Sequence, residues 1–430
     1  MTVYDSLRSM EEEIIKCMKC GNCQAVCPIY GETGAEAGVA RGKVQLAKGI
    51  LEGKLPITEG IAARFDLCLF CKSCQENCPC GVQVDRIILT ARSVIAKQRG
   101  LPLLKNAIFQ ILKRHKLFEG GLKAGRHLQG LAFQKYSEDS FVSPRFPFGL
   151  ATKRILQSLA AKTLKEQLQQ VSTVPKPKAR VAFFSGCMEN YLYPDIGKAV
   201  VDVLLINNVE VVVPFWQHCC GLPAMIHGDM QTARALARDH LHKFSSLDVD
   251  AVITACPTCI CALKHYYLEL VDGEQGLTQK AKTLAERTYD ISEYLVDILD
   301  YSRPCGPVTT RVTYHDPCHL VRGHRVVSQP RKILNDIPGA EFIEMKGAES
   351  CCGGAGSFCL THYDLSLKIN QRKVEAIRET NTNFVATACP ACQMQLNDGL
   401  LQAASLQRST HVVQLLAKAY AAELRAEKPF

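Results

Sequence analysis

Short apolar runs alternate with longer amphipathic stretches in the second half of the chain. The runs that begin at Arg180 and Ala251 are rich in Val, Ile and Phe, and each ends at a cysteine. Such β-branched and aromatic runs are typical of buried strands. Residues 230–241 and 365–377 carry apolar side chains at helical spacing. Strands that alternate with helices predict parallel α/β units for residues 180–430.

This half of the chain is a duplication. Five cysteines recur in the same order at an offset of 131 to 133 residues, and the two sets are Cys187, Cys219, Cys220, Cys256, Cys259 and Cys318, Cys351, Cys352, Cys389, Cys392. The flanking residues recur too, because Ala251-Val-Ile-Thr-Ala-Cys256 matches Phe384-Val-Ala-Thr-Ala-Cys389. Repetition at a fixed period indicates duplicated structural units. We expect two repeats, 180–305 and 306–430, with cysteines beyond the carboxyl ends of the strands.

The N-terminal segment, residues 1–99, carries a different cysteine pattern. Two runs match C-x2-C-x2-C-x3-C-P, and their cysteines are Cys17, Cys20, Cys23, Cys27 and Cys68, Cys71, Cys74, Cys78. In this pattern three close cysteines bind one cubane cluster and the fourth, next to proline, reaches the other. The sequence therefore predicts one [4Fe–4S] cubane on Cys17, Cys20, Cys23 and Cys78, and another on Cys68, Cys71, Cys74 and Cys27.

Paired zinc knuckles are the alternative for these two runs. Zinc sites use two CxxC pairs or mixtures of Cys and His, whereas these runs are triplets followed by Cys-Pro. The insertion between the runs, residues 29–67, is longer than in the smallest ferredoxins and has a helical pattern. We therefore expect a helical two-cluster domain of ferredoxin type rather than a ferredoxin β-fold.

Residues 100–179 contain no cysteine and carry most of the basic charge. Between Arg92 and Arg180 there are 18 Lys and Arg against 4 Asp and Glu, a net +14, so the remainder carries −5 of the total +9. The pattern at Leu103–Leu112 predicts a helix, and Val174–Lys178 has the composition of a linker. No interleaved aromatic residues or nucleic-acid motif accompany the charge, so we expect no nucleic-acid partner. A solvated helical surface, an acidic protein partner and anionic lipid headgroups remain as interpretations of this basic helical connector.

The count of 22 cysteines needs a cause. Disulfides require an oxidising compartment, and the first residues lack a basic stretch followed by an apolar core. The most apolar stretch, around Val200–Phe215, is interrupted by charged and polar residues and is too short to span a membrane. These features predict metal-bound thiolates in a reducing cytoplasm, with any membrane contact peripheral and on the inner face.

Several cysteines and histidines fall outside the predicted ligand sets. The histidines next to repeat cysteines are His218, His315 and His319. Hydrogen bonding to cluster sulfurs, or capping of a helix or strand, is the favoured interpretation of these residues, and direct ligation is the alternative. The remaining cysteines, interpreted as core or incidental thiols, are Cys80, Cys261, Cys305 and Cys359.

Each repeat contains one upstream cysteine, a Cys-Cys-Gly and a downstream Cys-x-x-Cys. In this pattern it resembles the cysteine-rich CCG domain of heterodisulfide reductase and related iron–sulfur subunits. The resemblance implies two further [4Fe–4S] clusters, each cubane or noncubane, unless one repeat is a structural pseudo-site. The implied fold is an α+β multidomain protein, with a helical two-cluster domain followed by a duplicated α/β CCG domain.

The chain lacks the parts of a complete dehydrogenase. Cys352-Gly-Gly-Ala-Gly-Ser357 belongs to the cluster motif and is not a dinucleotide-binding loop. No flavin signature is present, whereas oxidation of a 2-hydroxyacid releases a hydride that a flavin accepts. Along its whole length the chain resembles the iron–sulfur subunit of glycolate oxidase or D-lactate dehydrogenase. That resemblance implies an FAD-containing partner subunit, and a quinone or other membrane acceptor. The alternatives are a catalytic disulfide or heterodisulfide reductase, and the iron–sulfur subunit of anaerobic glycerol-3-phosphate dehydrogenase.

Overall fold

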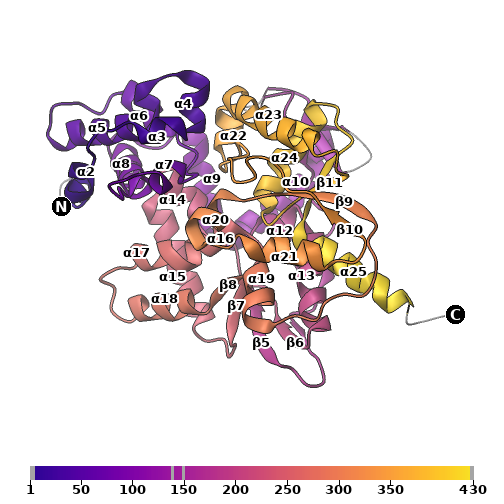
Figure 1. Ribbon diagram of the computed structural model, residues 1–430. Coiled ribbons are helices and arrows are strands. Elements are labelled where there is room, and N and C mark those ends of the chain that lie inside the picture. Colours follow the sequence, from indigo (N-terminus) through magenta and orange to yellow (C-terminus); the bar gives the residue numbers. More distant parts are fainter. Residues whose placement is uncertain (1–4, 137–139, 148–150, 427–430) are drawn as a thin grey trace.

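The N-terminal part contains only helices in the computed structural model, which describes residues 5–136, 140–147 and 151–426 (Figure 1). Its helices are α1 (Asp5–Arg8), α2 (Glu11–Ile15), α3 (Asn22–Ala25), α4 (Pro28–Thr33), the 3-10 helix η1 (Glu36–Gly38), α5 (Ala40–Leu51), α6 (Glu59–Asp66), α7 (Ser73–Glu76) and α8 (Val84–Arg99). Val44 and Ala47 of α5 are buried in one core with Ile87 and Ile88 of α8, as helical spacing of apolar residues requires. The prediction of a helical domain rather than a ferredoxin β-fold is confirmed.

The second half of the chain contains two sheets. The first sheet consists of β4 (Val171–Ser172), which the connector contributes, and of β5 (Ala179–Phe183), β6 (Val209–Val212), β7 (Ala251–Thr254) and β8 (Thr288–Asp290) of the first repeat, in the order β4-β6-β5-β7-β8. The second repeat's strands are β9 (Thr310–His315), β10 (Ala340–Phe342), β11 (Phe384–Thr387) and β12 (Arg408–His411), in the order β10-β9-β11-β12. Apart from the antiparallel edge strand β4, all pairs are parallel and the two orders are equivalent. The predicted duplication of an α/β unit is therefore confirmed.

Helices connect the strands of both repeats. In the first repeat they are α12 (Met188–Tyr191), α13 (Pro194–Ile206), α14 (Leu222–Ile226), α15 (Met230–Phe244), α16 (Pro257–Cys261), the π-helix η2 (Ala262–Tyr266), α17 (Tyr267–Leu270), α18 (Leu277–Glu286), α19 (Ile291–Glu293) and the π-helix η3 (Tyr294–Leu299). In the second they are α20 (Cys318–His324), α21 (Ser328–Asp336), α22 (Phe358–Thr361), α23 (Tyr363–Glu379), α24 (Pro390–Gln402) and α25 (Val412–Ala426). Helix α13 packs against α25, so the repeats share one hydrophobic core.

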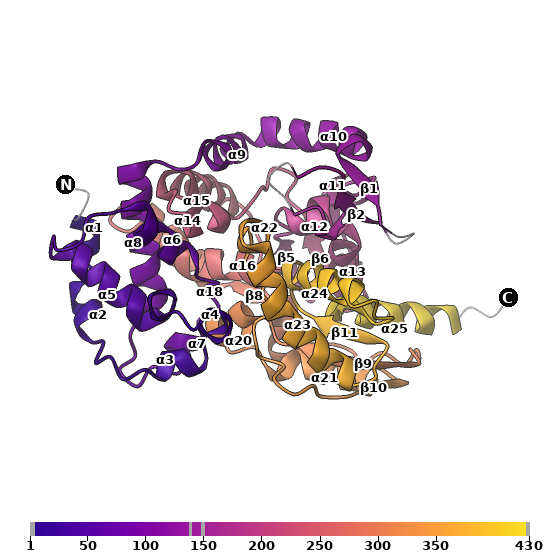
Figure 2. The same ribbon diagram turned by 90° about the horizontal axis from the view of Figure 1, so that it is seen from above.

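The connector contains α9 (Leu103–Lys113), α10 (His115–Ala132), β1 (Phe133–Lys135), β2 (Phe141–Pro144), β3 (Leu156–Gln157) and α11 (Leu164–Gln167). Helices α9 and α10 run along the outside of the molecule (Figure 2). In addition to the predicted helices, β1, β2 and β3 form an antiparallel sheet. Within the ranges that the structure describes, no helix is both long and apolar enough to cross a membrane.

Candidate iron–sulfur sites

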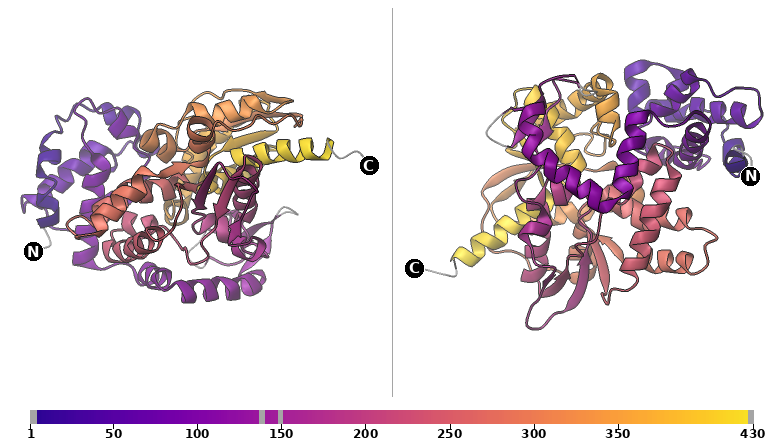
Figure 3. Two further views of the ribbon diagram at one scale, coloured as in Figure 1. Left: turned by 90° about the horizontal axis from the view of Figure 1, so that it is seen from below. Right: turned by 180° about the vertical axis from the view of Figure 1, so that it is seen from behind.

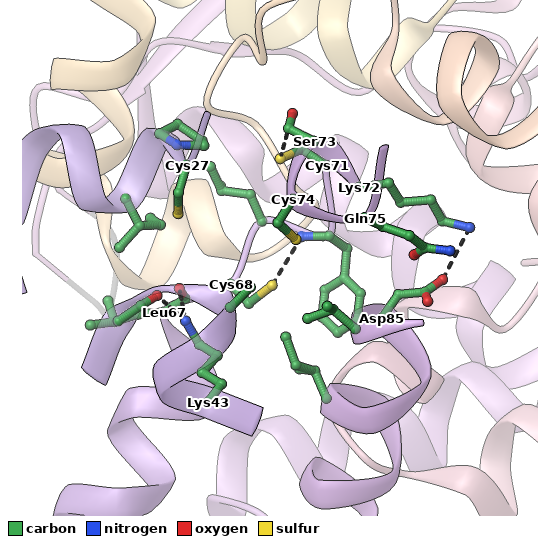
Figure 4. A pocket seen from close by; sticks show the side chains of 18 residues that line it. Cys27, Lys43, Leu67, Cys68, Cys71, Lys72, Ser73, Cys74, Gln75 and Asp85 are labelled. Carbon is green, nitrogen blue, oxygen red and sulfur yellow. Dashed lines mark hydrogen bonds and ion pairs between the residues drawn. The ribbon is translucent and has the colours of Figure 1, made fainter. Parts of the chain in front are cut away.

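The eight cysteines of the two Cys-Pro runs gather around two adjacent cavities, and the ninth N-terminal cysteine, Cys80, also lines one of them. One cavity is lined by Cys17, Cys20, Cys23 and Cys78, which we call the distal site. The other is lined by Cys27, Cys68, Cys71 and Cys74, which we call the proximal site (Figure 4). Each site thus combines three cysteines of one run with the last cysteine of the other, as crossed ligation requires. Cys74 also lines the distal cavity, so the two sites are neighbours.

The two N-terminal cysteine loops have the same unusual backbone. Lys19 and Gly21 have φ of 60° and 91°, and the equivalent Phe70 and Lys72 have φ of 51° and 59°. The left-handed conformation costs a residue other than glycine about 1–2 kcal/mol. Three such residues occupy it here, so tertiary contacts must stabilise the loops.

Two buried contacts hold the second of these loops. The Lys72 ammonium lies 3.1 Å from an Asp85 carboxylate oxygen, and both side chains are largely buried. The Arg92 guanidinium lies over the Phe70 ring, 4.6 Å from its centroid. Arg92 also donates hydrogen bonds to the backbone carbonyls of Phe65, Asp66, Cys68 and Ile226. Because Ile226 belongs to the first repeat, Arg92 couples the proximal loop to the rest of the molecule.

A buried lysine lies below the proximal site (Figure 4). Lys43 is 2% exposed and donates to the backbone carbonyls of Gly38 and Leu67. Burial lowers the pKa of Lys43, and the nearby thiols of Cys68 and Cys27 oppose that shift. A cation at this position stabilises negative charge on the four sulfurs.

The ten repeat cysteines line one cavity of about 170 Å³ between the two sheets. The first-repeat site consists of Cys187, Cys219, Cys220, Cys256 and Cys259, and the second-repeat site of Cys318, Cys351, Cys352, Cys389 and Cys392. Each site therefore presents five thiols, as the duplicated pattern predicts.

The Cys-Pro-x-Cys segments begin helices whose N-termini face the cavity. Cys256 is the N-cap of α16 and Cys389 that of α24, and each is followed by proline in the first turn. The Cys392 amide lies 3.4 Å from the Cys389 sulfur. The hydrogen bond from the Cys259 thiol lowers the pKa of Cys256 against the effect of burial. The backbone amides of Cys259 and Thr258 at the helix N-terminus lower the pKa of Cys256 as well. A helix N-terminus stabilises thiolates, and thiolates are the form that binds iron.

The glycine of each Cys-Cys-Gly is required by its conformation. Gly221 and Gly353 both have φ of +83°. A Cβ atom at Gly353 would lie 2.6 Å from the Ser366 carbonyl oxygen, and one at Gly221 would lie 3.3 Å from the Leu236 side chain. Glycine therefore lets each adjacent cysteine pair approach the helix that follows it.

Only one of the three flanking histidines reaches the repeat thiols. His315 is 1% exposed, and its imidazole shares a hydrogen bond with the Cys352 thiol. It groups with Cys352 and Cys392, with their ligand atoms within 4.8 Å of one another. In contrast, His218 bonds to Asp239 at 2.8 Å, and His319 bonds to the Phe70 carbonyl at 3.0 Å. Among these three histidines, contact with a repeat thiol is therefore specific to His315.

Sequence reasoning missed Glu189, which lies close to the first-repeat site. It is fully buried, and its carboxylate oxygens have no hydrogen-bond partner in the part of the chain that the structure describes. Burial raises the pKa of Glu189, and the thiols of Cys256 and Cys187 raise it further. The only signal was its position two residues after Cys187, where the second repeat has Leu320. Arg92 and Lys43 gave no local signal, because their partners are distant in sequence.

The proximal site directly adjoins the second-repeat site. Cys71 shares a thiol hydrogen bond with Cys351, which raises the pKa of Cys71 together with burial. Arg322 of α20 donates to the Cys71 carbonyl at 3.1 Å, and Ile29 and Phe358 pack in the same small core. Each site therefore adjoins the next in the order distal, proximal, second-repeat and first-repeat, and we call this series the row; Leu69 and Phe70 of the proximal loop also line the repeat cavity.

The four sets of residues fit iron–sulfur clusters. Burial raises the pKa of the Cys27 and Cys74 thiols, so ionising them without a bound cation is unfavourable. The ligand atoms of His315, Cys352 and Cys392 lie within 4.8 Å of one another, as in a metal site. Soft thiolates in sets of four or five suit iron–sulfur clusters. The fold and sites together define an iron–sulfur protein with a two-cluster module and tandem cysteine-rich domains.

Comparison with known families agrees with this class. The family model "4Fe-4S dicluster domain" matches residues 13–82, and the model "Cysteine-rich domain" matches residues 181–264 and 312–397. These matches decide against zinc knuckles. The two matches to the second model coincide with the two repeats.

Curated relatives narrow the class. The chain is 30% identical over 426 residues to the probable glycolate oxidase iron-sulfur subunit of Bacillus subtilis, covering 96% of this chain and 95% of that protein. It is 30% identical to one subunit of the fumarate reductase (CoM/CoB) of Methanothermobacter marburgensis, covering 89% of this chain and 68% of that protein. It is 28% identical to lactate utilization protein A 2 of Bacillus cereus, covering 56% of this chain and 98% of that protein. The chain belongs to the family of glycolate oxidase-type iron–sulfur subunits and is an electron-transfer subunit of an oxidoreductase.

A solved structure shares the fold. A hypothetical protein from Helicobacter pylori superimposes with a TM-score of 0.53 at 9% identity, covering 98% of this chain and 77% of that chain.

Proposed function

We propose that this subunit carries electrons to a quinone or other membrane acceptor. The electrons come from an FAD-containing partner that oxidises glycolate or D-lactate. The observation that supports this proposal most is the row of four cysteine sites, in which each site adjoins the next. Bound there, [4Fe–4S] clusters supply one-electron carriers that can accept a flavin's electrons in turn.

The chain's own residues hold the sites in order. The proposed ligands are the eighteen cysteines of the four sites, and the crossed sets keep the distal and proximal sites adjacent. Arg92 and Arg322 fix the proximal loop against the first and second repeats, respectively. Lys43 supplies fixed positive charge at the proximal site. This chain needs no substrate site for that role, because the hydroxyacid would bind to the partner.

Crossed ligation is tested by Cys78→Ser in anaerobically purified protein. We expect this change to damage the cluster at Cys17–Cys23, because Cys78 lines the distal cavity. EPR spectra of the reduced protein distinguish the two cubanes. Loss of only the proximal signal would refute the crossed assignment.

Disulfide reduction is the second candidate function. Both repeat sites open into one cavity, and the buried acid Glu189 lies beside thiols of the first-repeat site. Splitting an S–S bond consumes two electrons and two protons and yields two thiols. A protonated Glu189 would supply one of these two protons to the first-repeat site, and the other would come from solvent.

Anaerobic mixing separates the two functions. The holoprotein is combined with the purified flavoprotein partner and with either glycolate or D-lactate, and bleaching of the cluster absorbance is followed. The proposed relay predicts bleaching that requires both the partner and its substrate. Two results together would replace the first function by the second. The isolated chain would reduce a disulfide with reduced viologen as donor, and the clusters of this chain would stay oxidised when the flavoprotein and its substrate are added.

A further inference from the structure

Helices α9 and α10 expose an apolar stripe to the outside of the molecule. Seven large apolar side chains on these helices are between 39% and 88% exposed: Leu103, Leu104, Ile108, Ile111, Leu117, Leu128 and Leu131. Leu104, Ile108 and Ile111 are spaced four and three residues apart on α9, and Leu117, Leu128 and Leu131 are spaced eleven and three apart on α10, so each set follows one side of its helix. Eleven other large apolar side chains are exposed in the described chain, and they are scattered over the remaining elements. We call the seven residues the α9–α10 stripe.

Basic residues accompany the stripe. Helices α9 and α10 with Arg114 between them carry six Lys and Arg and one acid, Glu119. Glu119 is already engaged, 3.6 Å from Lys123. Three basic side chains at the junction of the helices, Lys113, Arg114 and Lys116, make no hydrogen bond or ion pair within the described residues. Their charge is therefore available to an external anionic surface.

The inner side of α9 contacts the first-repeat site. Phe109 and Leu112 are buried in one cluster with Cys219, and Phe118 of α10 and Cys187 pack against it. One helix, about 10–12 Å in diameter, therefore separates the first-repeat site from the stripe. Figures 2 and 3 show α9 and α10 lying along the outside of the first repeat, while β10 and α21 of the second repeat lie on the opposite side.

We propose that the α9–α10 stripe and the basic residues at its junction lie in the surface of an anionic lipid bilayer. This inference rests on the proposed function and deepens it, because it makes the first-repeat site the exit of the relay toward a membrane acceptor. Helices with Leu and Ile on one side and Lys and Arg beside them are the type that binds in the plane of a bilayer interface. Unpaired cations add attraction to anionic headgroups.

A membrane fits this surface better than a protein partner does. Centres of protein interfaces are depleted of Lys, whereas here unpaired basic residues lie between two apolar segments of the stripe. The two helices that carry the stripe also lie along an outer edge of the molecule (Figure 3). A protein partner is the competing outcome of the test.

The test is flotation of the anaerobic holoprotein with vesicles of phosphatidylglycerol and phosphatidylcholine in equal parts, against vesicles of phosphatidylcholine alone. We expect binding to the anionic vesicles that weakens as salt is raised. Leu104→Ser with Ile108→Ser and Leu128→Ser should weaken binding more than tenfold. The matched control, Ile298→Ser with Leu406→Ser, removes apolar side chains that are 53% and 96% exposed elsewhere and should bind like the unmodified protein.

A charge variant completes the test. Replacing Lys113, Arg114 and Lys116 by Gln should weaken anionic-vesicle binding by roughly a hundredfold. The same substitution at Lys97, Lys176 and Lys282, which are exposed and unpaired among the described residues, serves as the control and should bind normally. Absence of vesicle binding by an iron-replete protein would overturn the proposal. So would stripe variants that bind vesicles normally but no longer bind the flavoprotein in lipid-free solution. Bleaching of the cluster absorbance by the flavoprotein and its substrate, measured without lipid, tests the electron relay independently of membrane binding.

Discussion

The two cysteine-rich repeats have equivalent strand orders and equivalent cysteines, yet their sites have different neighbours. The second-repeat site contacts Cys71 of the proximal site and has His315 beside Cys352. The first-repeat site has Phe184 at the position of His315, lies beside Glu189, and packs against α9 at the outside of the molecule. Duplication thus reproduced the ligand set with its helix caps and glycines, whereas the neighbouring side chains His315, Glu189 and those of α9 belong to one site each. We infer that the second repeat receives electrons from the N-terminal sites and the first repeat passes them outward.

The largest expected difference between the repeats follows removal of a site. Cys352→Ser with Cys392→Ser, and separately Cys220→Ser with Cys259→Ser, should each remove about four of about 16 irons. The second-repeat variant should also interrupt the row, so the first-repeat cluster stays oxidised when the flavoprotein and its substrate are added. EPR of the frozen mixture measures this. Reduction of the first-repeat cluster at the normal rate in the second-repeat variant would break the proposed order.

Substitution of the two Cys-Cys-Gly glycines should give an intermediate difference between the repeats, in the free energy of unfolding. Gly353→Ala should destabilise the protein by about 3 kcal/mol, because a left-handed alanine is strained and its Cβ meets the Ser366 carbonyl oxygen. Gly221→Ala should cost only about 1 kcal/mol, since its nearest contact is the movable Leu236 side chain. The shift of the urea unfolding midpoint reports the difference. Equal shifts would show that the two glycine sites are equally constrained.

Substitution of the histidines beside the two repeat sites should give the smallest difference between the repeats, in the reduction potentials of their clusters. His315→Ala should shift the potential of the second-repeat cluster by roughly tens of millivolts, because hydrogen bonds to cluster sulfurs tune potentials. His218→Ala is the matched control and should leave the first-repeat potential nearly unchanged, since His218 bonds to Asp239 rather than to sulfur. Redox titration followed by EPR makes both measurements. A larger shift from His218→Ala would reverse the assignment of the sulfur contact to the second repeat.

Local patterns made much of this architecture predictable. The Cys-Pro runs and the repeat offset lie in short stretches of sequence, so the grouping of the cysteines followed from spacing alone. The edge strand β4 did not, because it forms only by pairing with Val211 and Val212 some 40 residues away. Arg92 and Lys43 were missed for the same reason, since tertiary contacts define their roles. The contact of Cys71 with Cys351 joins residues 280 positions apart, which no periodicity indicates.

The central claim is that four cysteine sites each hold a [4Fe–4S] cluster. Iron and acid-labile sulfide counted per chain in the anaerobically purified protein test it most directly. The account predicts about 16 of each, with about four fewer in either double cysteine variant. About eight of each, with both cubane signals intact and no change in the repeat variants, would mean that the repeats are empty and would contradict the account.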